Sequence, residues 1–195
     1  MHAALLNGFS EKDIEICGQE THDCLMRNTD RALRVKTRRG RGSQGRIDNI
    51  LFERVRIENV ATPLAVNSFY FCDTDGHSDY VQSRENPGAD HRTPSIGSIV
   101  FRDVQAEGCK LAAACLLGLQ ESKIEKVELI NARFSFAEDA LPAQPAMADG
   151  VPDCFRRGII ALNVRSLKLK DVTFDGVMGD EAELEVVDFL TRQKE

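Results

Sequence analysis

The chain contains no tryptophan and only two tyrosines among its 195 residues, so it offers few broad aromatic surfaces on which a ligand could stack. No apolar run approaches the ~18 residues that a membrane span requires. The first residues also lack the basic segment and the long apolar stretch of a signal peptide. The sequence as written therefore predicts a cytoplasmic chain with no membrane partner, although a longer parent could carry an export signal and be extracellular or periplasmic.

An excess of basic residues is absent too, because the formal net charge is −6 at pH 7. A chain of this charge is a poor general binder of nucleic acid, so we expect no nucleic-acid partner. The six cysteines include no Cys-x-x-Cys pair, and their spacing fits neither a zinc site nor a disulfide framework. We expect no metal and no cofactor, and we interpret the cysteines as buried free thiols of a reducing compartment.

A 13-residue pattern is present four times, at residues 47–59, 96–108, 124–136 and 164–176. The first positions are Ile, Ile, Ile and Val, and the fourth are Ile, Ile, Val and Leu. The sixth positions are Phe, Phe, Leu and Leu, and the ninth are Val, Val, Ala and Val. Such a repeat predicts a stacked solenoid rather than one closed core. A solenoid presents a long surface that suits a long ligand.

Each repeat has the pattern of two short strands joined by a bend. The fourth and sixth positions are apolar with an exposed-looking residue between them, which is strand alternation. Asp103, Asn131 and Asp171 then favour a sharp turn, because Asn and Asp tolerate unusual backbone angles. The pattern predicts an all-β parallel β-helix in which Ile stacks on Ile and Phe on Phe. A leucine-rich repeat is the alternative, since Leu167 and Leu169 resemble its strand, but the unit starts lie 49, 28 and 40 residues apart.

A basic stretch between residues 31 and 46 contains seven cationic side chains and no acid. It could form a nucleic-acid patch, although it lacks interleaved aromatic residues, or a solvated loop. A third interpretation is a carboxylate site, because Arg binds a carboxylate through a bidentate fork and Lys binds it as a point charge. The seven residues are Arg31, Arg34, Lys36, Arg38, Arg39, Arg41 and Arg46.

Within this stretch, Arg34-Val35-Lys36 followed by TRRGRG is similar to the Arg-Ile-Lys signature of the polygalacturonase family, glycoside hydrolase family 28. The resemblance continues from Asn49 to Tyr70, and the segments at 67–73 and 92–97 look like bacterial members of that family. It covers nearly the whole chain after residue 20. The family resemblance implies a right-handed parallel β-helix, in agreement with the repeat pattern.

The family hydrolyses galacturonate polymers by inversion, which requires an acid and a base with roughly 6.5–9.5 Å between the carboxyl groups. In the family, the Arg and Lys of the signature hold the substrate's own carboxylate beside the scissile bond. The resemblance therefore implies substrate-binding roles for Arg34 and Lys36. Tyr70 falls where the family has a sugar-contacting tyrosine. The implied partner is an acidic polysaccharide or an oligogalacturonide.

The catalytic motifs of the family are missing. They are an Asn-Thr-Asp, a paired Asp-Asp and a Gly-His-Gly that precede the Arg-Ile-Lys signature, and the residues before Arg34 supply neither of the last two. Asn28-Thr29-Asp30 spells the first motif, but it lies far too close to Arg34. Gly76-His77-Ser78 lies downstream and lacks the second glycine. We expect the C-terminal half of such an enzyme, truncated at the N-terminus and without a catalytic residue of its own.

The polar cluster of Asp73, Asp75, His77 and Asp79 contains side chains that can bind metal ions. We interpret it instead as a loop near the rim of the binding groove. We expect one partial β-helix domain over residues 1–195, with a possible irregular cap at 1–20 and a peripheral charged tail at 180–195.

Loss of upstream coils would expose unpaired backbone groups and apolar side chains, so we expect self-association through the N-terminal end. Two functions stay open at this point. The first is a polygalacturonase-like hydrolase of which this chain is a truncated or split portion. The second is a non-catalytic β-helix module that binds acidic oligosaccharide or persists as a relic.

Overall fold

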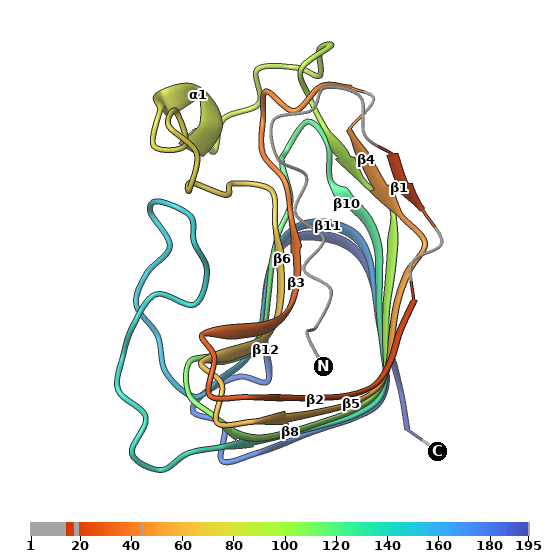
Figure 1. Ribbon diagram of the computed structural model, residues 1–195, viewed down its shortest axis with the longest axis vertical. Coiled ribbons are helices and arrows are strands. Elements are labelled where there is room, and N and C mark those ends of the chain that lie inside the picture. Colours follow the sequence, from red (N-terminus) through yellow and green to blue (C-terminus); the bar gives the residue numbers. More distant parts are fainter. Residues whose placement is uncertain (1–14, 18–19, 44, 195) are drawn as a thin grey trace.

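The computed structural model describes residues 15–17, 20–43 and 45–194, and these residues form stacked coils of β-strands (Figure 1). No helix in this part of the chain is long and apolar enough to cross a membrane. The elements in chain order are β1 (Glu15–Cys17), β2 (Glu20–Arg27), β3 (Arg31–Lys36), β4 (Arg46–Asp48), β5 (Ile50–Glu58), β6 (Thr62–Asn67), α1 (Asp79–Gln82), β7 (Ser95–Ile96), β8 (Ser98–Cys109), β9 (Ala112–Leu117), β10 (Ile124–Phe136), β11 (Arg157–Asp175) and β12 (Ala182–Gln193).

The strands lie in three rows, and each strand pairs in parallel with the equivalent strand of the next coil. The first row contains β2, β5, β8, β10 and the C-terminal part of β11. The second row contains β3, β6, β9 and the N-terminal part of β11, and the third contains β1, β4 and β7. This arrangement is the expected right-handed parallel β-helix. A leucine-rich repeat is excluded, because its units have one strand and a helical return.

The register between coils confirms the alignment of the repeats. Phe52 pairs with Phe101, Phe101 with Leu129, and Leu129 with Leu169. The rings of Phe52 and Phe101 stack with their centroids 5.3 Å apart and their planes 7° from parallel. Because equivalent positions stack, the repeat builds one continuous apolar core along the axis of the β-helix.

The eighth position of every repeat forms the bend between the two strands. Arg54, Asp103, Asn131 and Asp171 all have left-handed backbone angles, with φ between 50° and 53°. Asn131 Nδ2 donates to Asp103 Oδ1 at 2.6 Å, so the bends are also linked between coils. Arg54 lacks the preference of Asn and Asp for these angles. Its guanidinium instead holds Asp23 at 2.8 Å, at the bend of the preceding coil.

The segments for which the sequence predicts a cap and a charged tail contain the strands β1 and β12. Residues 1–14, 18 and 19 of the proposed cap lie outside the described residues, whereas β1 pairs with β4 as part of the coils. The segment at 180–195 is mostly β12, which pairs in parallel with β11 and adds a strand of a further coil. Most of its side chains are exposed, and the exposed fraction of Phe189 is 67%.

The cysteines are only in part the buried thiols that the sequence predicts. Cys109 and Cys115 are buried, and burial raises the pKa of each thiol to about 12. Cys24 and Cys154 are half-buried. The prediction is wrong for Cys72, which is exposed because it lies where the chain leaves β6 for an outer loop.

Candidate functional site

Arg34 and Lys36 lie on the outer face of β3, in the second row of strands. Side chains alternate between the two faces of a strand. Leu33 and Val35 point into the core, with exposed fractions of 1% and 6%. Arg34 and Lys36 must therefore point outward from the β-helix. Strand alternation thus brings the two cations of the predicted signature together on one face.

Tyr70 reaches the same face from the loop that follows β6. β6 is in register with β3, so that Lys36 lies beside Asn67. The backbone N–H of Tyr70 donates to the Thr37 carbonyl at 3.2 Å. Lys36 Nζ donates to the Tyr70 hydroxyl at 2.9 Å and lies 4.0 Å from the centroid of the ring. Lys36 and Tyr70 are therefore in direct contact although they are far apart in the sequence.

A hollow on this face is lined by all three residues for which the sequence predicts substrate binding. It spans about 260 Å³ of space, part of which is open to solvent. Within the described part of the chain, none of the lining residues is acidic. The lining residues are Arg31, Arg34, Val35, Lys36, Ala65, Asn67, Tyr70, Ala146 and Met147.

The hollow carries positive charge that no described residue neutralises by contact. The Arg34 guanidinium makes no hydrogen bond or ion pair with any described residue. Burial lowers the pKa of Lys36, and the nearby charge of Arg34 lowers it further. Burial raises the pKa of Tyr70 to about 12, so its hydroxyl is protonated at neutral pH. An anion bound here would relieve the repulsion between Arg34 and Lys36.

Three other arginines of the basic stretch are already paired with acids. Arg38 and Arg41 each hold Asp73 at 2.6 Å. Arg39 and Glu121 form an ion pair at 2.6 Å, and both side chains are only 1% exposed. These ion pairs link the segment that follows β3 to the loops that contain Asp73 and Glu121. The three arginines are therefore structural residues that a charge count cannot separate from ligand-binding ones.

The two remaining arginines of the stretch also have partners. Arg46 pairs with Asp48, and Arg31 donates to two backbone carbonyls. Of the seven cations between residues 31 and 46, Arg31, Arg34 and Lys36 have no acidic partner among the residues that the structure describes. Arg31 is held by backbone carbonyls and Lys36 by the Tyr70 hydroxyl, whereas Arg34 contacts no described hydrogen-bond acceptor. The structure thus favours a small anion site over a broad basic patch.

The polar residues between 73 and 79 contact other loops rather than a common centre. Asp75 pairs with Arg38 at 2.8 Å. His77 Nδ1 lies 2.9 Å from a carboxylate oxygen of Asp149. Asp79 is the first residue of α1. No group of three His, Cys, Asp or Glu side chains among the described residues is placed to hold a metal ion. These contacts fit a loop beside the hollow.

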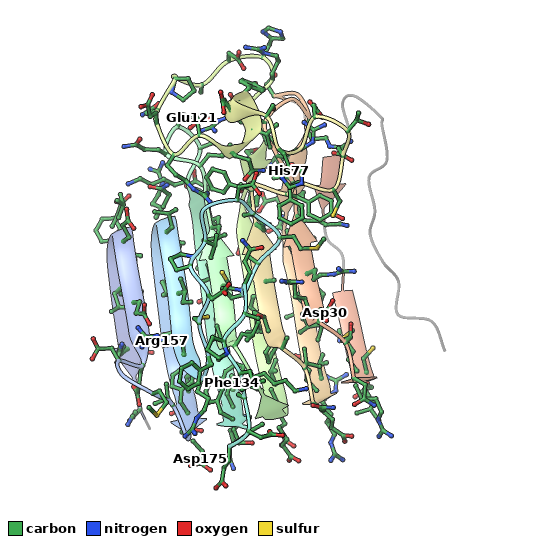
Figure 2. The ribbon with its side chains drawn as sticks, turned by 90° about the vertical axis from the view of Figure 1, so that its left-hand side faces the viewer. Asp30, His77, Glu121, Phe134, Arg157 and Asp175 are labelled. Atoms are coloured by element: carbon green, nitrogen blue, oxygen red, sulfur yellow. The ribbon has the colours of Figure 1, made fainter. Side chains whose placement is uncertain are left out.

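The loop of residues 137–156 forms one wall of the hollow. It connects β10 to β11 and crosses in front of the second row of strands (Figure 2). Ala146 and Met147 line the hollow, and Asn67 Nδ2 donates to the Met147 carbonyl at 3.0 Å. Sequence reasoning missed this wall, because a segment rich in Ala, Pro and Asp predicts a loop but not where the loop lies.

The two segments that spell incomplete catalytic motifs do not line the hollow. Asn28-Thr29-Asp30 forms the link between β2 and β3, and Asp30 is exposed. Gly76-His77-Ser78 precedes α1 in an outer loop, where His77 stacks on Phe71 with the ring centroids 4.6 Å apart. Neither segment places a carboxylate among the residues that line the hollow.

The comparison with protein families gives a match. The sequence model of Glycosyl hydrolases family 28 matches residues 10–138, which is more than half of the chain. The matched range contains Arg34, Lys36 and Tyr70, and it ends where the loop of residues 137–156 begins. No curated protein and no solved structure matches the chain. The parallel β-helix and the family match agree, and the chain belongs to glycosyl hydrolases family 28.

Proposed function

We propose that the hollow binds the carboxylate of a galacturonate unit and is the substrate-binding site of a polygalacturonase-like glycoside hydrolase. The observation that carries the proposal is the pair of outward-facing cations Arg34 and Lys36, which have no acidic partner in the described part of the chain. Family membership supports a glycosidic substrate. The charge of the hollow supports an acidic one.

Each of the three residues suits one part of this task. Arg34 would hold the two carboxylate oxygens through its planar fork, and Lys36 would add a second positive charge. Tyr70 fixes the position of Lys36 through the 2.9 Å hydrogen bond and offers its hydroxyl to the sugar. A hydrogen bond to a charged group contributes about 1.5–3 kcal/mol. One such contact from Arg34 therefore corresponds to roughly a tenfold to hundredfold change in affinity.

We also propose that this chain by itself binds galacturonan without cleaving it. Inverting hydrolysis needs an acid whose pKa is raised, and no acid lines the hollow in the described residues. Asp73 is close enough to act electrostatically on Lys36 and Tyr70. Burial raises the pKa of the Asp73 carboxyl, but the bonds with Arg38 and Arg41 outweigh burial and lower it. An ionised carboxylate cannot donate the proton that the leaving group needs.

Calorimetric titration with trigalacturonate tests the binding site. We expect Arg34→Ala to weaken binding by at least about tenfold, the low end of one charge-assisted contact. Arg56→Ala is the matched control, because it removes the same charge from an arginine of β5 that is 65% exposed. Equal losses in the two variants would mean that the chain attracts the ligand by diffuse charge alone, and the proposed site would be wrong.

A reducing-sugar assay on polygalacturonate tests the second part of the proposal. We expect no release of reducing ends above that of a heat-denatured sample. Steady turnover by the purified chain would contradict the proposal. Loss of that turnover in Asp73→Asn would then identify Asp73 as a catalytic carboxylate.

A further inference from the structure

The loop of residues 137–156 is an insertion at a corner of the β-helix. In the preceding coil, only Lys110 and Leu111 connect β8 to β9. The loop starts and ends beside these two residues, because the backbone N–H of Ala137 donates to the Cys109 carbonyl and that of Arg156 donates to the Lys110 carbonyl. The long loop therefore leaves and re-enters the coil at one place, and it is free to lie across the outer face.

The loop is held on that face by a buried apolar contact. Ala146 and Ala148 are 1% and 0% exposed, and they pack in one cluster with Cys115 and Leu117 of β9 and with Phe69. Partly buried side chains of β11 pack against the same cluster. Because the loop buries these outward-facing apolar side chains, it packs stably against the outer faces of β9 and β11.

Polar side chains of β3 and β6 hold one edge of the loop of residues 137–156. Arg31 Nε donates to the Pro145 carbonyl at 3.1 Å. Thr62 Oγ1 donates to the same carbonyl at 2.9 Å, and Asn67 Nδ2 donates to the Met147 carbonyl at 3.0 Å. The edge of the loop is thus placed directly beside the hollow that contains Arg34.

A second loop, residues 68–94, contacts the other side of the loop of residues 137–156. The backbone N–H of Asp149 donates to Gln82 Oε1 at 2.9 Å, and Arg84 Nη2 donates to the Asp149 carbonyl at 2.7 Å. His77 adds its contact with the Asp149 carboxylate. The loops of residues 68–94 and 137–156 therefore meet over the second row of strands, as the side view shows (Figure 2).

A ligand held by Arg34 and Lys36 can consequently extend along the β-helix in one direction only. Neighbouring strands lie about 4.8 Å apart, so β9 lies roughly 10 Å from β3, and its outer face is already buried. We propose that the site takes the terminal uronic acid of a chain rather than an internal stretch of polymer. This inference rests on the proposed function, and the loop of residues 137–156 is the element that closes the groove.

The number of protein molecules bound per polymer chain tests this inference on the unaltered protein. Sedimentation of the chain with polygalacturonates of two defined lengths gives that number. We expect one molecule per polymer at both lengths, because each polymer has one end of each kind. A number that grows with polymer length would show binding to internal units and overturn the inference. Absence of binding to either polymer and to trigalacturonate would instead overturn the proposed function.

A loop-deletion variant tests the role assigned to the loop. Residues 137–156 are replaced by Lys-Leu, the link of the preceding coil, and circular dichroism with trigalacturonate titration reports whether the variant is folded and still binds. We expect several molecules of this variant per long polymer, because the outer faces of β9 and β11 are open. One molecule per polymer from a folded, binding variant would show that the loop does not close the groove.

Should the deletion unfold the protein or abolish binding, because Ala146 and Met147 line the hollow, the measurement on the unaltered chain still decides the inference. Polymers whose reducing end has been converted to an alditol distinguish the two ends in the same assay. Retained binding assigns the site to the non-reducing end, and lost binding assigns it to the reducing end. Both results support recognition of a chain end. Several molecules bound per alditol polymer would contradict it.

Discussion

Removing one partner of the buried ion pair between Arg39 and Glu121 is expected to destabilise the outer loops strongly. The two side chains are each 1% exposed, and the pair is bidentate, with distances of 2.6 and 3.0 Å. Arg39 also donates to the carbonyls of Tyr80, Ser83 and Glu85, which lie in α1 and directly after it. One guanidinium thus joins the segment after β3, the loop that carries α1 and the residues before β10.

Removal of one partner leaves the other charge buried and unpaired, which costs about 3–5 kcal/mol. We therefore expect Glu121→Leu and Arg39→Met each to lower the free energy of unfolding by that amount. In the double variant no buried charge is left, so its loss should be clearly smaller than the sum of the two single losses. It should not vanish, because three carbonyls still lack a donor at about 1 kcal/mol each.

Urea unfolding followed by circular dichroism gives the four free energies of this double-mutant cycle. Single losses below about 1 kcal/mol, the value of an exposed surface pair, would refute the reasoning, because they would mean that water reaches the pair. Additive losses in the double variant would refute it as well, because they would mean that the two charges do not interact.

Two further predictions concern pH. Lys36 has a lowered pKa and must be protonated to bind an anion, so calorimetric titration with trigalacturonate should show affinity falling as pH rises through that pKa, below the ordinary 10.5. Lys36→Arg should abolish this fall, and a fall that persists would contradict the assignment. The Asp73 carboxyl has a lowered pKa, so its stabilising contribution is complete above its ordinary value of 3.8 and is lost as pH falls through the lowered value. Urea unfolding should therefore show Asp73→Asn destabilising the protein at pH 7 but progressively less below 3.8, and a constant difference would contradict this.

The coils could be predicted because the apolar pattern is local and repeats. Phe52, Phe101, Leu129 and Leu169 occupy one position in the alignment and one stack in the structure. The strand within the charged segment at 180–195 is harder to predict from the sequence. Apolar and acidic residues alternate from Ala182 to Val186 in β12, but most of its side chains are exposed and many are charged, which is also the pattern of a surface tail.

The candidate site could be predicted only in part, because its selectivity depends on contacts between distant residues. Alternation along β3 separates Arg34 and Lys36 from their apolar neighbours. Nothing local shows that Arg39 meets Glu121, 82 residues away, while Arg34 meets no acid among the described residues. The position of the loop of residues 137–156 cannot be predicted from the sequence either. It depends on Thr62 and Asn67, which lie 83 and 80 residues before the loop residues that they contact.

The most direct test of carboxylate recognition compares trigalacturonate with its methyl ester, which has the same sugar rings without the charges. Calorimetry on the unaltered chain should show at least about tenfold weaker binding of the ester, as expected for loss of one charge-assisted contact. In Arg34→Ala this penalty should shrink, because the residue that distinguishes the two ligands is gone. Equal affinity of the unaltered chain for both ligands would contradict the account, since the two cations would then play no part in choosing the sugar.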